Sequence, residues 1–263
     1  MNPTEKALWF VESHLPDAIS LDDVAASSGV SRFHVTRAFS AATGRSVMGY
    51  MRARRLSEAA RKLAGGASDI LAVALDAGYG SHEAFTRAFR DQFGTTPELV
   101  RAGGSTQNLD LVEPILMDSS LLTALEPPLF ETSRAFLIAG LGERYSCETS
   151  AGIPMLWQRF GPYIGNIPGE VPGVAYGVCT NADDAGDLPK DFCRVRVPAQ
   201  KYAVFAHREH ISTIRRTVNT IWNRWLPASG HEIADAPDFE RYGPEFDPRS
   251  GNGGLEIWVP IKG

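Results

Sequence analysis

Hydrophobic residues recur at helical spacing in two stretches of the first hundred residues, 31–44 and 81–94. In each stretch the apolar side chains fall on one helical face, which is the face expected to meet a core. These positions are Val35, Ala38, Phe39 and Ala42, and Phe85, Ala88 and Phe89. The sequence SRFHVTRAFSAATG of the first stretch returns as SHEAFTRAFRDQFG in the second, with six of fourteen positions identical. The chain is therefore predicted to contain two copies of one small helical module.

A shorter predicted helix and a glycine turn precede each copy. The pattern V-A-x-x-S-G from Val24 matches V-A-x-x-A-G from Val73, and the second copy has one extra residue, Gly80, before its serine. Gly44 and Gly94 stand where the longer helices are expected to end, because glycine is the usual residue just after a helix. Each module is therefore predicted to be a helix-turn-helix.

Both modules, with the Thr96-Pro97 that follows them, resemble the AraC/XylS family of transcription regulators over residues 21–101. A helical bundle with an accidental repeat is the alternative reading. The resemblance implies that the polar faces of the two longer helices contact DNA. The implied DNA-binding residues are Arg32, Phe33, Thr36 and Arg37 in the first helix, and Glu83, Ala84 and Arg87 in the second.

The chemistry of these side chains suits base reading. Arg37 and Arg87 can each donate two hydrogen bonds to guanine, and Glu83 can accept one from a cytosine amino group. Ala84 and Phe33 can contact a thymine methyl group. For the two arginines, a phosphate contact or an intramolecular salt bridge stays open as an alternative.

Basic residues concentrate around the first module. The whole chain has a formal net charge of −5, but residues 31–62 hold eight basic residues and one acidic residue, a net of +7. Such local charge favours DNA, because phosphate neutralisation supplies much of the binding free energy. Five of these residues are interpreted as phosphate contacts or structural residues: Arg32, Arg45, Arg52, Arg54 and Arg55. If Arg54 contacts phosphate, its removal should weaken binding to every sequence alike.

Residues 47–64 are predicted to form one helix, about 27 Å long at roughly 1.5 Å per residue. A helix of this length can hold two recognition helices about one DNA turn, roughly 34 Å, apart. We therefore expect one chain to reach two successive major-groove segments. The same helix can serve as core scaffold.

From residue 109 onward short β-rich runs alternate with helices. Strands are predicted at 135–141, 174–180, 192–197, 201–207, 239–242 and 255–261, and helices at 153–163 and 211–226. This order makes two β-α-β-β halves, whose sheets could join edge to edge and leave a cleft. The fold class is two domains: an all-α double helix-turn-helix domain, 1–104, then an α+β domain with a mostly antiparallel sheet, 110–263. Residues 105–109 are interpreted as a linker.

The second domain resembles the GyrI-like family of effector-binding domains. The likeness lies in Tyr145-Ser146-Cys147, in Phe239-Glu240-Arg241-Tyr242 and in EIWVPI from Glu256. The resemblance implies a small-molecule cleft that contains the glutamate. Strand alternation places Glu256 and Trp258 on one face, and a wetted sheet face is the alternative explanation for that pair. The candidate ligand-binding residues are Glu256, Trp258, Trp157, Tyr176 and Tyr242.

These features predict a sequence-specific DNA-binding transcription regulator whose second domain binds small hydrophobic or cationic effectors. The expected partners are double-stranded DNA, the effector and RNA polymerase. One alternative is a hydrolase of reactive small molecules that uses Glu256 with Tyr176 or Tyr242. A protein-interaction module is the third reading of the second domain.

No cofactor, metal or membrane partner is expected. The sequence has no P-loop, Rossmann fingerprint or catalytic-triad signature, and no apolar run of about 18 residues. Three cysteines, an odd count, and the lack of a signal-peptide pattern favour a cytoplasmic setting. His207 and His210 form an HxxH pattern, interpreted as a solvated strand end. Asp183, Asp184 and Asp187 are interpreted as part of a surface loop.

Overall fold

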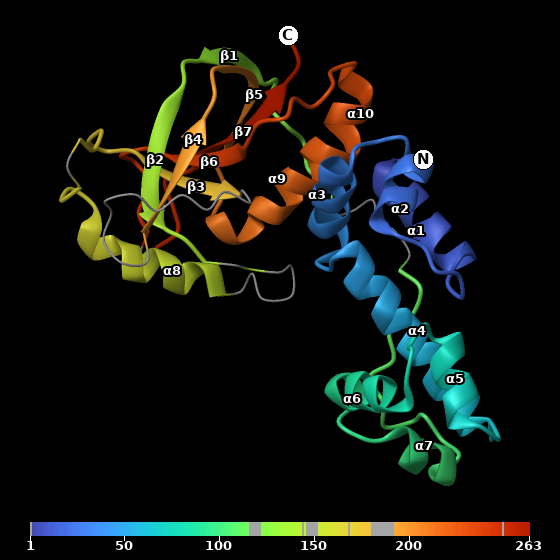
Figure 1. Cartoon of the computed structure of the whole chain (residues 1–263). Coiled ribbons are helices and arrows are strands. Elements are labelled where there is room, and N and C mark those ends of the chain that lie inside the picture. The colour runs from blue at the N-terminus through green and yellow to red at the C-terminus, as the bar shows by residue number, and fades with distance from the viewer. Residues whose placement is uncertain are drawn as a thin grey trace. The chain divides into compact units, whose positions relative to one another are not determined.

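The computed structural model describes residues 2–115, 122–143, 145, 152–167, 169–179, 192–248 and 250–263. The chain forms two compact units, Met1–Met117 and Asp118–Gly263. The first is built from helices, and the second from antiparallel sheets and helices (Figure 1). The predicted fold class, an all-α domain followed by an α+β domain, is confirmed.

Short helices joined by tight turns make up the first unit. They are α1 Pro3–Ser13, α2 Leu21–Ser28, α3 Arg32–Thr43, α4 Val47–Ala64, α5 Ile70–Asp76, α6 His82–Phe93 and α7 Pro97–Gly103. The two predicted helix-turn-helix modules correspond to α2–α3 and α5–α6. The predicted long helix is α4.

The second helix of each module begins and ends in the same way. Ser31 and Ser81 each accept a hydrogen bond, at 3.2 Å, from the backbone N–H three residues later. Such a cap satisfies a donor that has no partner within the helix. Gly44 and Gly94 follow the last turns with φ of 73° and 67°, a left-handed conformation that glycine adopts without a Cβ clash. The repeated sequence therefore produces repeated helix boundaries.

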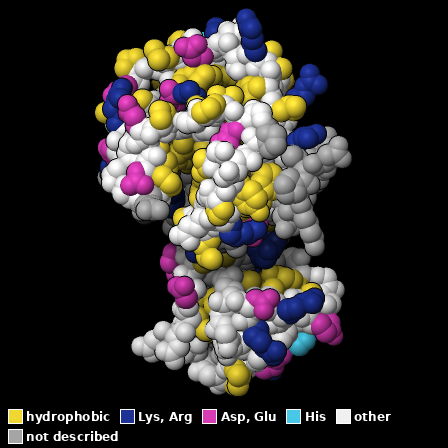
Figure 2. Space-filling view, turned by 90° about the vertical axis from the view of Figure 1, so that its left-hand side faces the viewer, with side chains coloured by type: hydrophobic (Ala, Val, Ile, Leu, Met, Phe, Trp, Pro, Cys, Tyr) yellow, Lys and Arg dark blue, Asp and Glu magenta, His cyan; other side chains and the backbone are white. Residues whose placement is uncertain are grey.

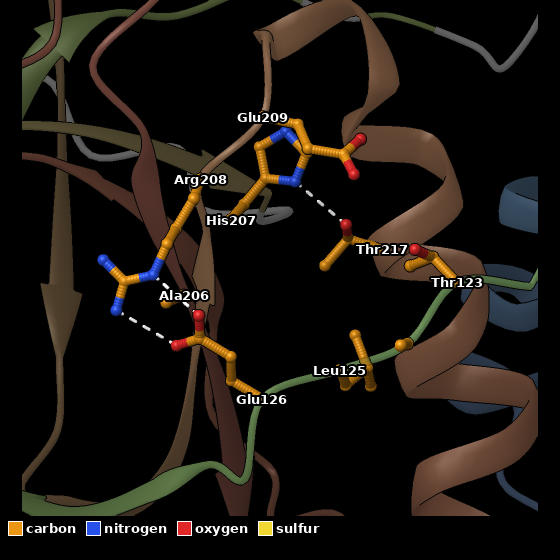
Figure 3. A pocket seen from close by; sticks show the side chains of 9 residues that line it. Thr123, Leu125, Glu126, Ala206, His207, Arg208, Glu209 and Thr217 are labelled. Carbon is orange, nitrogen blue, oxygen red and sulfur yellow. Dashed lines mark hydrogen bonds and ion pairs between the residues drawn. The ribbon is translucent and has the colours of Figure 1, made fainter.

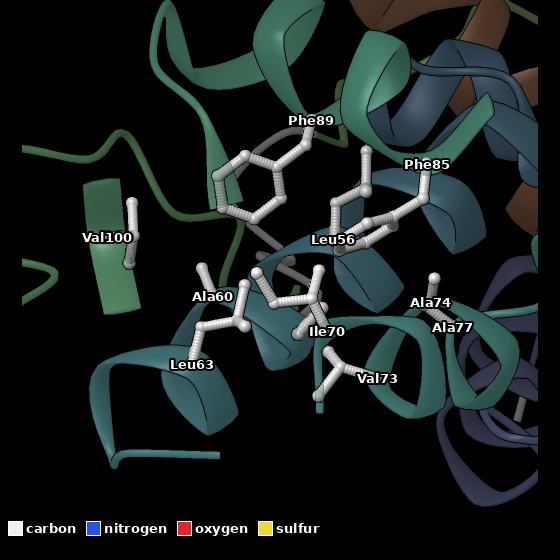
Figure 4. Close-up of a cluster of buried hydrophobic side chains, with 11 residues drawn as sticks. Leu56, Ala60, Leu63, Ile70, Val73, Ala74, Ala77, Phe85, Phe89 and Val100 are labelled. Carbon is white, nitrogen blue, oxygen red and sulfur yellow. The ribbon is translucent and has the colours of Figure 1, made fainter. Parts of the chain in front are cut away.

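Each module has its own hydrophobic core, and α4 contributes to both. The second core joins aliphatic residues of α4 and α5 to the rings of Phe85 and Phe89 on α6, whose centroids lie 5.5 Å apart (Figure 4). The first core contains Phe39 of α3 and Tyr50 of α4, with ring centroids 5.7 Å apart. Helix α4 is thus the scaffold on which both modules are fixed.

The chain that follows α7 stays with the first unit. Leu109 and Leu111 pack against the second core, and Val112 and Ile115 pack against the first. The helical unit therefore extends beyond residue 104. Residues 110–115, which the sequence analysis placed with the second domain, lie in the first unit.

The second unit contains seven strands within its described residues. They are β1 Leu129–Ser133, β2 Phe136–Leu141, β3 Ala175–Cys179, β4 Phe192–Val197, β5 Gln200–His207, β6 Asp238–Tyr242 and β7 Leu255–Ile261. The helices are α8 Ile153–Phe160, α9 Ile214–Thr220 and α10 Leu226–Ser229. A π-helical turn, Ile221–Trp225, joins α9 to α10, so the predicted helix 211–226 is one helical run. Strand β1 was not predicted.

Five strands form one antiparallel sheet in the order β1-β5-β7-β6-β3, and β2 pairs separately with β4. Strand β3 of the first predicted half pairs with β6 of the second, so the halves join edge to edge as expected. The first half differs from the expected β-α-β-β unit, because β2 and β4 form a separate two-stranded sheet without β3. In addition, β1 adds an outer strand beside β5. The five-stranded sheet therefore combines β3 of the first half with β5, β6 and β7 of the second.

The two faces of this sheet differ in burial. On β7, Ile257 is buried, whereas Glu256 and Trp258 are partly exposed, which confirms the predicted alternation. Phe205 of β5 is paired with Ile257, and its ring centroid lies 4.8 Å from that of Trp225 in the helical run. Helices therefore cover one face, and the opposite face carries Glu256.

Candidate functional sites

The face of α3 opposite the first core carries residues that the sequence analysis assigned to DNA. Helical spacing places Phe33, Thr36 and Arg37 on that face. Phe33 is 39% exposed, and Thr36 and Arg37 are partly buried. Arg32 lies in the first turn and forms an exposed ion pair with Asp22 of α2 at 3.4 Å. The two guanidinium groups, the threonine hydroxyl and the phenylalanine ring can contact phosphates and base edges.

Helix α6 has a more mixed surface. Glu83 and Arg87 are exposed, and Ala84 is partly buried. Arg90, which the sequence analysis did not assign to DNA, is exposed on the same stripe, since 83, 87 and 90 follow helical spacing. Hydrogen bonds from its own backbone N–H and from Ser81 lower the pKa of Glu83. The Glu83 carboxylate is therefore charged at neutral pH and acts only as an acceptor.

Arg54 does not belong to the surface of the first unit, because its side chain is only 5% exposed. The guanidinium donates two hydrogen bonds to Glu12, at 2.9 and 3.0 Å, and one to Glu58 at 3.0 Å. It also donates to the Val112 carbonyl at 2.9 Å. Although burial opposes the charge, hydrogen bonds to these carboxylates raise the pKa of Arg54. Of the two interpretations of Arg54, a phosphate contact or a structural residue, these contacts favour the structural one, because its donors are engaged within the unit.

Tyr50 completes this group, which we call the ion cluster: Glu12, Tyr50, Arg54 and Glu58. The Tyr50 hydroxyl donates to Glu12 at 2.5 Å and accepts from the Ile115 N–H at 3.1 Å. Burial, together with the hydrogen bond to Glu12, raises the pKa of Tyr50 to about 12, so the hydroxyl stays protonated. The ion cluster ties α1 and α4 to the segment that follows α7.

Other basic residues between 31 and 62 are also engaged inside the first unit. Arg55 donates to two backbone carbonyls of the loop after α1. It also lies against Gly78, where an added Cβ would be 2.8 Å from the guanidinium. Arg61 and Lys62 pair with acidic side chains of the unit. The net charge of +7 therefore overstates the positive charge that is accessible to DNA. The accessible charge depends more on exposed residues such as Arg52.

A pocket of about 380 Å³ opens on the sheet face that carries Glu256 and Trp258. All strands except β4 contribute to its lining. The lining residues are Leu129, Glu131, Ser133, Phe136, Tyr176, Val204, Phe239, Arg241, Glu256 and Trp258. Three of the predicted ligand-binding residues, Glu256, Trp258 and Tyr176, are thus brought together. Six of the ten lining residues are aliphatic or aromatic, and four are polar or charged. Small-molecule sites combine apolar side chains with a few polar groups in this way.

Aromatic rings form the floor of this pocket. Phe239 pairs with Trp258 across β6 and β7, and their rings stack with centroids 5.3 Å apart. Tyr176 and Phe136 meet Phe239 at 5.7 and 5.9 Å. Figure 2 shows further hydrophobic side chains exposed among charged ones on the strand-rich unit, in the upper part of the view. The floor offers ring faces to an apolar ligand.

An ion pair occupies one end of the pocket. The strand register sets Arg241 opposite Glu256 and Tyr176 opposite Arg241. One Glu256 carboxylate oxygen accepts from the Arg241 guanidinium at 3.0 Å and from the Trp258 indole at 2.9 Å. Although partial burial opposes the charge, the hydrogen bond to Glu256 raises the pKa of Arg241. The predicted hollow beside Trp258 exists, but its carboxylate is paired with an arginine that the sequence analysis left out.

Trp157 and Tyr242 lie away from the pocket. The ring centroids of Trp157 on α8 and Tyr242 on β6 are 4.8 Å apart, and the Tyr242 hydroxyl donates to Glu240. Neighbours on a strand point to opposite faces. Phe239 and Arg241 therefore line the pocket, and Tyr242 does not. The alternation within the 239–242 motif could have indicated this division.

A smaller cavity of about 130 Å³ lies where β5 ends beside α9 (Figure 3). Arg208 donates two hydrogen bonds to Glu126 on one side of it, at 2.7 and 3.0 Å. His207 is buried, with its ring nitrogens 2.9 Å from the Thr217 hydroxyl and 3.3 Å from the His210 carbonyl. The interpretation of His207 as part of a solvated strand end is wrong, because Thr217 of α9 covers it.

Within the described ranges, no three His, Cys, Asp or Glu side chains gather in a way that could hold a metal ion. None of the helices in those ranges is long and apolar enough to cross a membrane. Five residues singled out in the sequence lie outside the described residues: Ser146, Cys147, Asp183, Asp184 and Asp187.

Comparisons with known proteins match both units. Residues 126–262 match the GyrI-like small molecule binding domain, and residues 24–103 match a helix-turn-helix domain. The right origin-binding protein of Escherichia coli strain K12 is 28% identical over 288 residues, which cover 97% of this chain and 96% of that protein. The transcriptional regulator Rob of Salmonella typhimurium is 27% identical over 282 residues, with the same coverage of 97% and 96%.

A solved structure also matches the chain in part. It is a transcriptional regulator with an AraC-type DNA-binding domain from Chromobacterium violaceum, at 28% sequence identity and a TM-score of 0.38. The match covers 40% of this chain and 94% of that one.

Proposed function

This chain belongs to the AraC-family transcription regulators that carry a GyrI-like small molecule binding domain, and on that premise we propose that its first unit reads a specific DNA sequence while its second unit binds a small hydrophobic or cationic effector. One observation carries the proposal. Helices α3 and α6 begin at equivalent serines and present polar side chains at equivalent positions.

The side chains of the two recognition helices support base reading. Arg37 and Arg87 occupy equivalent positions, and each can donate two hydrogen bonds to guanine, while Glu83 can accept from cytosine. Phe33 and Ala84 can contact thymine methyl groups. Helix α4, about 27 Å long, can hold the two recognition helices near one turn of DNA, roughly 34 Å, apart. A single chain would then span two successive major-groove segments.

The pocket supports the effector part of the proposal. Its volume of about 380 Å³ lies within the range of roughly 300–1,000 Å³ found for small-molecule sites. The stacked rings of Phe239 and Trp258 can hold a flat apolar body or a cation. Glu256 shares one oxygen between Arg241 and an indole, an arrangement that does not suit the carboxylate to removing a proton. Binding without turnover is therefore the expected behaviour.

Two further expectations follow from regulation of transcription. RNA polymerase is the expected protein partner, because a regulator bound near a promoter acts through it. The cytoplasm is the expected location, with the DNA.

Selection of double-stranded DNA from a random pool by the full chain tests the proposal. We expect one enriched sequence with two conserved segments about one turn apart, roughly 10 base pairs. Repeating the selection with a library of hydrophobic cations should change the yield of the same sequence. Recovery of DNA without any enriched sequence would contradict specific reading, and conversion of a library member would favour the hydrolase alternative.

A further inference from the structure

The pocket has a second polar end, formed by Glu131 on β1. Glu131 pairs with Tyr202 of β5, whereas Glu256 pairs with Ala206 of the same strand. These two partners on β5 are four residues apart, about 13 Å at roughly 3.3 Å per residue. Trp258 pairs with Val204, which lies between them on the same strand. Glu131 and Glu256 therefore face the aromatic floor from opposite ends.

The charges at the two ends are balanced differently. The Glu256 carboxylate is compensated by Arg241 at 3.0 Å and by an indole N–H. Glu131 is exposed and forms no ion pair or hydrogen bond within the described residues. Since Glu131, Glu256 and Arg241 are the charged residues of the lining, the pocket has a net formal charge of −1. That uncompensated charge lies at Glu131.

Lys201, a cation on the neighbouring strand, does not supply the missing compensation. Its ammonium group lies 5.8 Å from the ring centroid of Phe130. Phe130 and Glu131 are consecutive residues of β1, so they point to opposite faces of the sheet. Lys201 is accordingly engaged on the face away from the pocket.

We propose that Glu131 recognises the cationic or hydrogen-bond-donating end of the effector, while Glu256 acts as the fixed partner of Arg241. This inference rests on the effector-binding function proposed above. The effector class is an elongated apolar cation, whose charged end meets Glu131 and whose rings cover Phe239 and Trp258. A carboxylate at the pocket edge keeps its water until the ligand arrives, so the free protein bears little desolvation cost. Contact of the cation with the aromatic floor adds to the attraction.

A matched pair of probes separates charge from shape. The first is (naphthalen-2-ylmethyl)trimethylammonium, and the second is 2-neopentylnaphthalene, in which carbon replaces the nitrogen. Dissociation constants are measured on the full chain by quenching of tryptophan fluorescence. The proteins are the unmodified chain, Glu131→Gln, the double variant Arg241→Gln with Glu256→Gln, and Glu232→Gln. The last removes a carboxylate that pairs with Lys262 outside the pocket, and it serves as the control.

The unmodified chain should bind the cation more tightly than the neutral probe. Glu131→Gln should weaken the cation about two- to fivefold, the loss expected for one exposed charge pair, and should leave the neutral probe unchanged. It should also reduce the dependence of cation binding on salt. The double variant removes a pair that is already neutral, so it should weaken both probes by a similar factor and keep their ratio. Glu232→Gln should bind as the unmodified chain does.

Three other outcomes have distinct meanings. If the double variant loses the preference for the cation and Glu131→Gln keeps it, Glu256 is the recognising carboxylate and the inference is wrong. Equal binding of both probes to the unmodified chain also overturns it, although the pocket would still be an effector site. Binding of neither probe would count against the proposed effector function itself.

Discussion

The two helix-turn-helix modules share their helix boundaries but are stabilised by different chemistry. The second module is held by rings: the centroids of Phe85 and Phe89 lie 5.5 Å apart, and those of Phe89 and Phe93 lie 4.7 Å apart. The first module relies on the ion cluster beside its core, in which Arg54 joins α4 to Glu12 of α1. The repeated sequence fixes the turns and the helix caps, whereas the interactions that stabilise each core differ between the two modules.

The recognition helices differ in charge in a parallel way. Helix α3 carries Arg32 and Arg37 and no acidic residue, whereas the Arg87 and Arg90 of α6 are balanced by Glu83 and Asp91. Attraction to phosphate is sequence-independent, while donors and acceptors aimed at base edges discriminate. The difference suggests that α3 supplies more of the affinity and that α6 supplies proportionally more of the discrimination.

Replacing Arg54 by alanine should have the largest effect on the first module. The variant leaves the Glu12 carboxylate, which is 26% exposed, without its cation. Removal of one partner of a buried pair costs about 3–5 kcal/mol, so we expect a loss near the lower end of that range. The measurement is the free energy of unfolding in urea, with hydrogen exchange of α1 and α4 to locate the change. Arg52→Ala, which removes an exposed arginine two residues earlier, is the control and should change the free energy by less than about 0.5 kcal/mol. Equal effects of the two variants would show that the ion cluster stabilises nothing.

Alanine at Arg37 or Arg87 tests whether both helices read bases. Each variant should lose about 1–3 kcal/mol of binding free energy at one base position of the selected site. The measurement is binding to a set of sites with single-base changes at several salt concentrations. Arg32→Ala should instead weaken all sites alike and lower the salt dependence by about one ion. If both variants lose affinity but keep the same preference among the sites, the two arginines contact phosphates and not bases.

Alanine at the turn glycines compares the two turns directly. Gly29 has φ of 70° with open space around its Cβ position, so Gly29→Ala should cost only the backbone strain, about 1–2 kcal/mol. Gly78 has φ of 84°, and a Cβ there would be 2.8 Å from the Arg55 guanidinium. Gly78→Ala should therefore cost more, because Arg55 must also move from its carbonyl partners. Unfolding free energies that are equal for the two variants would mean that Arg55 moves freely.

Local patterns predicted those parts of the molecule that depend on local rules. The repeat at 31–44 and 81–94 indicated both recognition helices, since caps and helical spacing are read within a dozen residues. The alternation around Glu256 indicated which side of β7 meets the helices. Strand β1 gave no such signal, because most of its residues are exposed, and an outer strand need not carry an apolar stripe.

Pairing between distant segments could not be read from the sequence. Arg241 reaches Glu256 only because β6 and β7 pair in one particular register. Arg54 appeared to be one more basic residue of a polar helix face, and its main partner, Glu12, lies 42 residues away in the chain. Both cases concern charge compensation, which depends on the tertiary arrangement.

The pH dependence of the first module should show the smallest effect. Burial would raise the pKa of Glu12, but hydrogen bonds from Arg54 and Tyr50 outweigh it and lower this pKa below its ordinary value of 4.5. A carboxyl whose pKa is lower in the folded chain than in the unfolded chain stabilises the fold above the unfolded value, and this contribution is lost as the pH falls through the folded value. The difference in unfolding free energy between the unmodified chain and Glu12→Gln should therefore be constant from pH 7 to 5 and should shrink below 4.5. A difference that grows on acidification would mean that protonated Glu12 binds Arg54 better than the carboxylate does, which contradicts an ion pair.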